Sequence, residues 1–175
     1  GGFAFQSTVV GGRVPREYVP AVKRGCEDAM AQGSVAGYPG VDVQVVLTDG
    51  SFHAVDSSDM AFRTCASQAF KAAFRQAAPQ LLEPTMKLEI ASPDDYLGDI
   101  IGDLSRRRGR VTAMRRYRKG SQKISAVVPL AAMFGYATSL RSLSSGRANH
   151  SMEFDSFTAL PAELAAEVIA AGREK

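Results

Sequence analysis

The pattern of apolar and polar residues in the first part of the chain predicts four elements. Two stretches rich in β-branched and aromatic residues are typical of strands, and each precedes a segment whose apolar residues recur at helical spacing. Turn residues separate them, with Gly11-Gly12 after the first strand and Gly33 after the first helix. The order is strand 3–10, helix 19–32, strand 41–48 and helix 58–77. The residues predicted to be buried on the helices are Val22, Cys26, Ala29, Met30, Phe62, Cys65, Ala66, Ala69, Phe70 and Ala73.

The second part of the chain predicts a strand-helix-strand-strand-helix-strand order. Pro79 and Pro84 bracket a boundary near Glu83. The predicted elements are strands at 86–90, 111–117, 122–128 and 147–154, with helices starting at Ser92 and Pro129 and ending near 109 and 145. The second helix is expected to turn Leu130, Met133, Phe134, Ala137 and Leu140 inward, and a further helix is expected at 162–171. The fold class is therefore α+β in two domains, the second with the ferredoxin-like split βαβ order.

Composition places the chain among ordinary globular proteins. Of its 175 residues, 45% are hydrophobic and 22% charged, so the chain can bury a core. No apolar run reaches the roughly 20 residues that cross a bilayer, and the first residues lack the features of a signal peptide. Cys26 and Cys65 have no metal-binding or redox spacing and are expected to be buried thiols. These features favour a cytoplasmic chain without a membrane partner.

The net charge of +3 is unevenly distributed. Up to Glu83 the chain has 7 Lys/Arg against 8 Asp/Glu, whereas the remainder has 14 against 10. No acidic residue lies between Asp103 and Glu153, which makes this segment a candidate surface for a polyanion. A solvated basic face without a ligand is the alternative.

The segment 50–58 is the candidate functional loop, because a predicted strand and a predicted helix hold it on both sides. Ser57 or Ser58 is the expected helix cap, and His53 lies near the apex. A plain connection in which His53 caps or packs remains the alternative. The residues of this loop singled out here are Gly50, Ser51, Phe52, His53, Val55, Asp56, Ser57 and Ser58.

Patterns for other chemistry are missing from the sequence. There is no phosphate-binding loop with a lysine, and the glycines at 33–40 follow a helix and indicate a turn. Only two histidines exist, and the aspartates at 42, 49, 56 and 59 lack metal-ligand spacing. His53, Asp56 and Ser57 lack a nucleophile elbow, and His150 is expected to pack on the sheet. We therefore expect no catalytic residue and no metal site.

Long stretches over nearly the whole chain match one known pattern, in the right order. They are Pro15-Arg16-Glu17-Tyr18-Val19-Pro20-Ala21-Val22, Ala36-Gly37-Tyr38-Pro39, Gly50-Ser51-Phe52-His53, Leu82-Glu83-Pro84, Ile101-Gly102-Asp103-Leu104-Ser105-Arg106-Arg107-Arg108-Gly109, Met133-Phe134-Gly135-Tyr136-Ala137-Thr138 and Met152-Glu153-Phe154. On these residues the chain resembles the C-terminal part of the elongation factor G family, the bacterial GTPases of translocation.

The resemblance implies a domain division. Residues 1–83 are similar to the family's fourth domain, a left-handed βαβ fold like that of ribosomal protein S5, without its first strand and second tip loop. Residues 84–160 are similar to the fifth, ferredoxin-like domain, and 161–175 form a C-terminal helix or tail. GTP and Mg would then be bound by domains of the parent protein outside these residues, and this segment would need no cofactor.

The resemblance also implies partners. The loop with His53 would lie near the mRNA and the tRNA anticodon in the decoding region of the small subunit, and the fifth domain near the ribosomal RNA at the stalk base of the large subunit. A monomer is expected. The residues assigned to ribosomal RNA are Arg106, Arg107, Arg108, Arg115, Arg116, Arg118, Lys119, Arg141 and Arg147.

Two positions depart from the family pattern. Ser34-Val35 replaces the usual Pro-Leu, and the hairpin residues 115–119 are more basic than the family leads us to expect. Three alternatives stay open at this point: a paralogue used in ribosome recycling or ribosomal protection, a stand-alone RNA-binding module, and a small hydrolase using His53.

Overall fold

The computed structural model describes residues 2–172, which form two compact units. The first comprises Gly1–Gln80 with Pro161–Lys175, and the second comprises Leu81–Leu160. Among the described residues, no helix has both the length and the apolar character needed to span a bilayer. The predicted terminal helix is confirmed as α5 (Ala162–Gly172).

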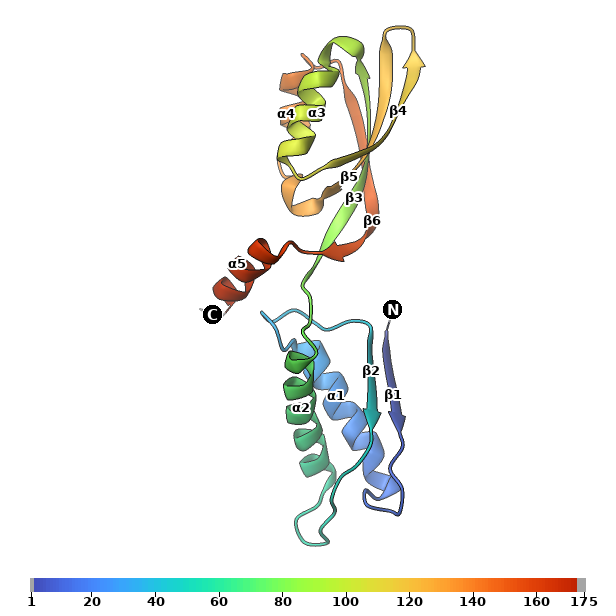
Figure 1. Cartoon of the computed structure of the whole chain (residues 1–175), viewed down its shortest axis with the longest axis vertical. Coiled ribbons are helices and arrows are strands. Elements are labelled where there is room, and N and C mark those ends of the chain that lie inside the picture. The colour runs from blue at the N-terminus through green and yellow to red at the C-terminus, as the bar shows by residue number, and fades with distance from the viewer. Residues whose placement is uncertain (1, 173–175) are drawn as a thin grey trace. The chain divides into compact units, whose positions relative to one another are not determined.

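The first unit has the predicted strand-helix-strand-helix order (Figure 1). Its elements are β1 (Phe3–Ser7), α1 (Val19–Gln32), β2 (Val43–Leu47) and α2 (Asp59–Gln76). The two strands pair in parallel, with Phe5 opposite Val45. Both helices lie on the same side of this small sheet (Figure 1). The buried core residues come from the facing helix surfaces, and the inward side chains of the strands pack against them: Val22, Cys26, Ala29, Ala66 and Phe70.

Both strands of the first unit are shorter than the apolar pattern predicted. The first ends at Ser7, and Val10 is 78% exposed. The second starts at Val43, because Asp42 adopts a φ of +57° that extended backbone does not allow. Cys65, Ala69 and Ala73 were predicted to be buried, and they are exposed. A sheet of two strands is too narrow to cover the whole apolar face of α2.

The helices α1 and α2 approach closely at Gly25. A Cβ on this residue would overlap the carbonyl oxygen of Arg63 and lie 3.0 Å from the Cβ of Ala66. Arg63 also donates from Nε to Asp28 at 2.6 Å, and this hydrogen bond lowers the pKa of the Asp28 carboxyl. Because only glycine permits this separation, Gly25 sets the distance between the two helices.

The second unit has the predicted ferredoxin-like order. Its elements are β3 (Leu82–Pro93), α3 (Leu97–Arg106), β4 (Arg110–Arg118), β5 (Ser121–Pro129), α4 (Tyr136–Leu143) and β6 (Asn149–Ala159). The antiparallel sheet has the strand order β4-β5-β3-β6. Both helices cover one face of it (Figure 1). A single 3-10 turn precedes each of α1, α3 and α4. These turns are Arg16–Tyr18 in the first unit and Asp94–Tyr96 and Leu130–Ala132 in the second.

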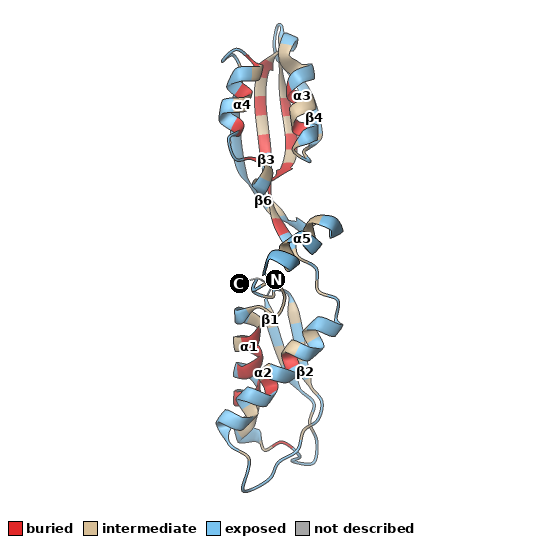
Figure 2. Ribbon diagram, turned by 90° about the vertical axis from the view of Figure 1, so that its left-hand side faces the viewer, coloured by how far each residue is buried: buried red, intermediate tan, exposed pale blue. Residues whose placement is uncertain are grey.

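Burial in the second unit follows the two-residue period of its central strands. Leu88 and Ile90 of β3 and Ile124 of β5 are fully buried against Ile100 and Leu104 of α3. Figure 2 shows the alternation as red and tan bands along β3. The core therefore lies between the central strands and the helix layer.

Several predicted elements of the second unit begin at other residues. The helix predicted from Ser92 begins at Leu97, because Ser92 and Pro93 are the last residues of β3. The strand predicted at 147–154 spans Asn149–Ala159. The strand predicted from Met86 begins at Leu82, because pairing with β6 continues past a bulge at Thr85/Met86. The helix predicted from Pro129 begins at Tyr136, because Gly135 adopts a φ of +73° and interrupts it. Phe134 and Ala137, predicted to face inward, are therefore exposed, Phe134 by 82%.

Replacing Gly25 with alanine tests the close helix contact. We expect overpacking to cost about 1–3 kcal/mol, offset in part by the ~1 kcal/mol helix preference of alanine. Urea unfolding followed by circular dichroism measures the net loss. The control is Gly102→Ala in α3, where a Cβ meets nothing within 4 Å and a gain of about 0.5–1 kcal/mol is expected. Equal effects of the two substitutions would contradict the packing argument.

Candidate functional site

The loop between β2 and α2 lies at one end of the first unit (Figure 1). Most of its residues are exposed to solvent. Val55 is 94% exposed and Phe52 is 40% exposed. Ser51, His53, Asp56 and Ser58 are also exposed, while Gly50 and Ser57 are half-buried. The structure thus brings all the predicted loop residues together on one connection. His53 is accessible at the surface and does not pack into the core.

An aromatic stack holds the base of this loop. The ring of Tyr18 lies between Phe52 of the loop and Phe62 of α2, with ring centroids 5.8 Å and 4.7 Å apart. Interplanar angles of 29° and 19° make both contacts stacked. Three segments far apart in the sequence are therefore joined at one point.

Hydrogen bonds close the loop around His53. The backbone N–H of His53 donates to Oγ of Ser57 at 2.9 Å, and the N–H of Ser57 donates to the carbonyl oxygen of His53 at 2.9 Å. Ser58 is the helix cap, since its Oγ accepts from the N–H of Ala61 at 3.0 Å. One serine thus shapes the turn and the next starts α2, so the two predicted cap candidates have different roles.

Sequence reasoning missed the second segment of this site, which runs from β1 to α1. Val14 is buried, and a Cβ on Gly50 would overlap its Cγ2 atom. Nη1 of Arg13 lies 3.0 Å from Oδ2 of Asp49, at the start of the loop. The signal for this segment was Arg16-Glu17-Tyr18, which belongs to a stretch that carries the family resemblance. The residues between β1 and α1 therefore pack against the start of the loop 50–58.

The side chains of this loop are suited to hydrogen bonding with a ligand. His53 offers two ring nitrogens, and Ser51 offers a hydroxyl, for phosphate or ribose oxygens. The Ser57 hydroxyl accepts a bond from the backbone of His53, and no described hydrogen bond joins it to the imidazole. Among residues 2–172, no three His, Cys, Asp or Glu side chains gather to hold a metal ion.

The predicted basic residues of the second unit divide between two ends of its sheet. The hairpin turn lies at the Pro93 end of β3, because Ser121 pairs with Pro93. Arg147 reaches the same end, where hydrogen bonding with Ser145 first and Arg147 second lowers the pKa of the Tyr96 phenol. Arg106 lies at the C-terminal end of α3, towards the start of β3. Arg115, Arg116, Arg118, Lys119, Arg141 and Arg147 are all exposed.

Two of the predicted RNA-binding arginines have partners inside the protein. Arg108 makes a two-pronged ion pair with the buried Glu83, at 2.7 Å and 2.8 Å. Arg107 donates from Nε to Asp103 at 2.8 Å and from Nη1 to the carbonyl oxygen of Ala132 at 2.6 Å. These bonds connect α3 to β3 and to the turn before α4. RNA contact by these two residues stays a prediction, but their charges are already balanced.

Arg107 also anchors Tyr136. Its guanidinium carbon lies 5.2 Å from the centroid of the Tyr136 ring, and His150 meets the same ring edge-on at 5.2 Å. Burial raises the pKa of the Tyr136 phenol well above its usual range. His150 was predicted to pack on the sheet; it contacts this ring of α4 and is exposed overall.

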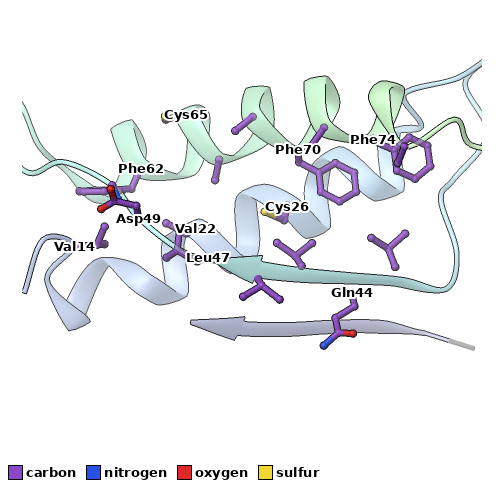
Figure 3. Close-up of a pocket in the computed structure, with 18 of the residues that line it drawn as sticks. Val14, Val22, Cys26, Gln44, Leu47, Asp49, Phe62, Cys65, Phe70 and Phe74 are labelled. Carbon is purple, nitrogen blue, oxygen red and sulfur yellow. The ribbon is translucent and has the colours of Figure 1, made fainter. Parts of the chain in front are cut away.

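A second candidate site is an apolar groove between β2 and α2, of about 560 Å³ (Figure 3). Phe70, Phe74 and both cysteines line it, and burial raises the pKa of Cys26. Gln44 and Asp49 are the polar side chains labelled in Figure 3. The groove follows the edge of β2 that pairs with no described strand. It lacks the converging polar groups of a small-molecule site and marks incomplete coverage of α2.

Comparison with known proteins gives this geometry a family. The sequence model of elongation factor G, domain IV, matches residues 1–78, and that of the elongation factor G C-terminus matches residues 80–168. The chain belongs to the elongation factor G family. A crystal structure of a protein from Thermus thermophilus is similar, with 34% sequence identity and a TM-score of 0.83. The similarity covers 99% of this chain and 26% of that one, so the chain spans about a quarter of that relative's length.

The family assignment agrees with the two units. The division at Gln80/Leu81 coincides with the junction between the two family matches, whereas residues 161–168 of the second match belong to the first unit. The aromatic-braced loop falls in the domain IV match, and the basic hairpin falls in the C-terminal match. The chain is thus part of an elongation factor G-like translation factor.

Removing the central ring of the stack tests how the loop is held. In Tyr18→Ala, losing two aromatic pairs is expected to cost about 1–3 kcal/mol. Residues 50–58 should exchange their amide hydrogens faster while the rest of the first unit stays protected. Hydrogen exchange read by mass spectrometry measures this. Tyr38→Ala, at a site 57% exposed, is the matched control. Unchanged exchange in the loop of the Tyr18 variant would refute the bracing role.

Proposed function

We propose that this chain is the ribosome-contacting part of a translocation factor. The loop 50–58 is the tip that enters the decoding region and approaches mRNA and the tRNA anticodon. The second unit binds ribosomal RNA near the stalk base of the large subunit. The parent protein acts as a monomer, binds GTP with Mg and hydrolyses it in other domains, and this part is not catalytic.

The observation that carries the proposal is the combination of exposure and bracing at the tip. Val55 and His53 are presented to solvent, while the Phe52–Tyr18–Phe62 stack and the Ser57 hydrogen bonds restrict the loop. A preorganised loop loses less conformational entropy when it binds. Such contacts position a backbone rather than read a base sequence.

The distribution of charges supports different roles for the two units in binding. In the first unit, Arg13, Arg24 and Arg63 are paired with Asp49, Asp59 and Asp28. In the second unit, the hairpin holds half of the exposed cations predicted to contact RNA, and no described ion pair neutralises them. Affinity for a polyanion therefore comes mainly from the second unit, and the tip adds placement.

Directed hydroxyl-radical probing tests where each unit lies on the ribosome. An iron chelate is attached to Val55→Cys or to Phe134→Cys, both in a Cys65→Ser background because Cys65 is exposed. We expect the Val55 probe to cleave small-subunit RNA of the decoding region. The Phe134 probe should cleave large-subunit RNA, because its position is 82% exposed in the second unit. Cleavage absent from both, or identical for both, would overturn the proposal.

The salt dependence of ribosome binding tests the hairpin cations. Replacing Arg115, Arg116 and Arg118 with alanine should reduce the slope of log affinity against log salt by about 1 per lost phosphate contact. The control removes three cations from the first unit: Lys23, Arg24 and Arg75. Sedimentation with ribosomes at several salt concentrations measures both slopes. A triple hairpin variant with the wild-type slope would exclude these residues from RNA contact.

A further inference from the structure

The hairpin of β4 and β5 carries a feature that phosphate binding alone does not explain. Four exposed cations surround its turn, Arg115, Arg116, Arg118 and Lys119. Between Arg116 and Arg118 the pairing with β5 shifts register, so Tyr117 has no partner residue across the ladder. Bulges of this kind redirect a side chain away from the regular pleat. The Tyr117 side chain is 51% exposed in the middle of the cations.

Arg118 holds the tyrosine ring in place. Its guanidinium carbon lies 4.9 Å from the centroid of the Tyr117 ring, and Nη2 donates to the phenol oxygen at 3.4 Å. A cation over one ring face leaves the rest of the exposed ring for another planar group. The same guanidinium remains close enough to neutralise a phosphate beside that group.

The turn of the hairpin is anchored to the end of the sheet. Gly120 adopts a φ of +73°, and its carbonyl oxygen accepts a hydrogen bond from the N–H of Asp94 at 3.1 Å. Asp94 and Asp95 are exposed beside this anchor and repel a polyanion from that side. The hairpin therefore presents Tyr117 on a fixed support, with its favourable approach away from these carboxylates.

We propose that this hairpin binds single-stranded or looped-out RNA, with an unpaired base stacked on the ring of Tyr117. The neighbouring phosphates contact Arg115, Arg116, Arg118 and Lys119. An A-form duplex keeps its bases stacked inside, so only an unpaired nucleotide has a face to offer. Stacking on an aromatic side chain tolerates any base. This inference rests on the proposed function and adds the class of RNA to it.

A tryptophan probe tests for the stacked base directly. The chain has no tryptophan, so Tyr117→Trp gives a single reporter at the hairpin. A short oligouridylate should quench its fluorescence. Inorganic polyphosphate supplies charge without bases, and an RNA duplex of the same length hides them, so both should quench little. Quenching by all three, or by none, would overturn base stacking.

Affinity measurements separate the ring from the charges. Tyr117→Ala should weaken oligouridylate binding about tenfold, with the salt slope unchanged because no charge is removed. Tyr117→Phe should bind like the wild type, since it retains the ring. Phe134→Ala is the control, because it removes another exposed aromatic ring of the second unit. This variant should also bind like the wild type.

The outcomes distinguish this inference from the proposed function. Wild type and Tyr117→Ala binding the oligonucleotide equally would refute stacking and leave ribosome binding intact. A wild-type chain that binds neither the oligonucleotide nor ribosomes at low salt would overturn both proposals. Equal binding to polyglutamate would show a general site for polyanions and would also refute recognition of RNA bases.

Discussion

The position of Tyr18 is the constraint on which the candidate site depends. Its ring contacts Phe52 of the loop and Phe62 of α2, and it stands directly before α1. Since Gly25 sets the separation of α1 and α2, the geometry of the helix pair is passed on to the loop. The exposed loop 50–58 therefore has a defined position relative to α1 and α2, although it contributes nothing to the core.

Pairing of charges organises the second unit. The segment between Asp103 and Glu153 contains no acid, so its acidic partners come from outside it: Glu83 binds Arg108, and Glu89 binds Lys123. The hydrogen bond from Lys123 lowers the pKa of the Glu89 carboxyl. A stretch without acids is thus not a uniformly basic surface once the chain is folded. What remains for a polyanion is concentrated at the hairpin and beside Arg141 and Arg147.

Sequence patterns located the elements better than their ends. The order of helices and strands in both units followed from periodicity, because apolar spacing reports which face is buried. Errors arose where one backbone angle decided the outcome, as at Asp42 and Gly135, and where sheet pairing extended β3 through Pro84. Cys65 was misjudged because helical spacing cannot tell how wide a sheet will cover the helix.

The sequence by itself determined the fold class, the family and the loop that carries His53, since these follow from local spacing and long matching stretches. The tertiary structure alone decided which residues brace that loop and which arginines are already paired. Tyr18 and Phe52 are far apart along the chain, as are Glu83 and Arg108. Contacts of this kind depend on how elements pack, and a one-dimensional pattern holds no record of distance between its separated parts.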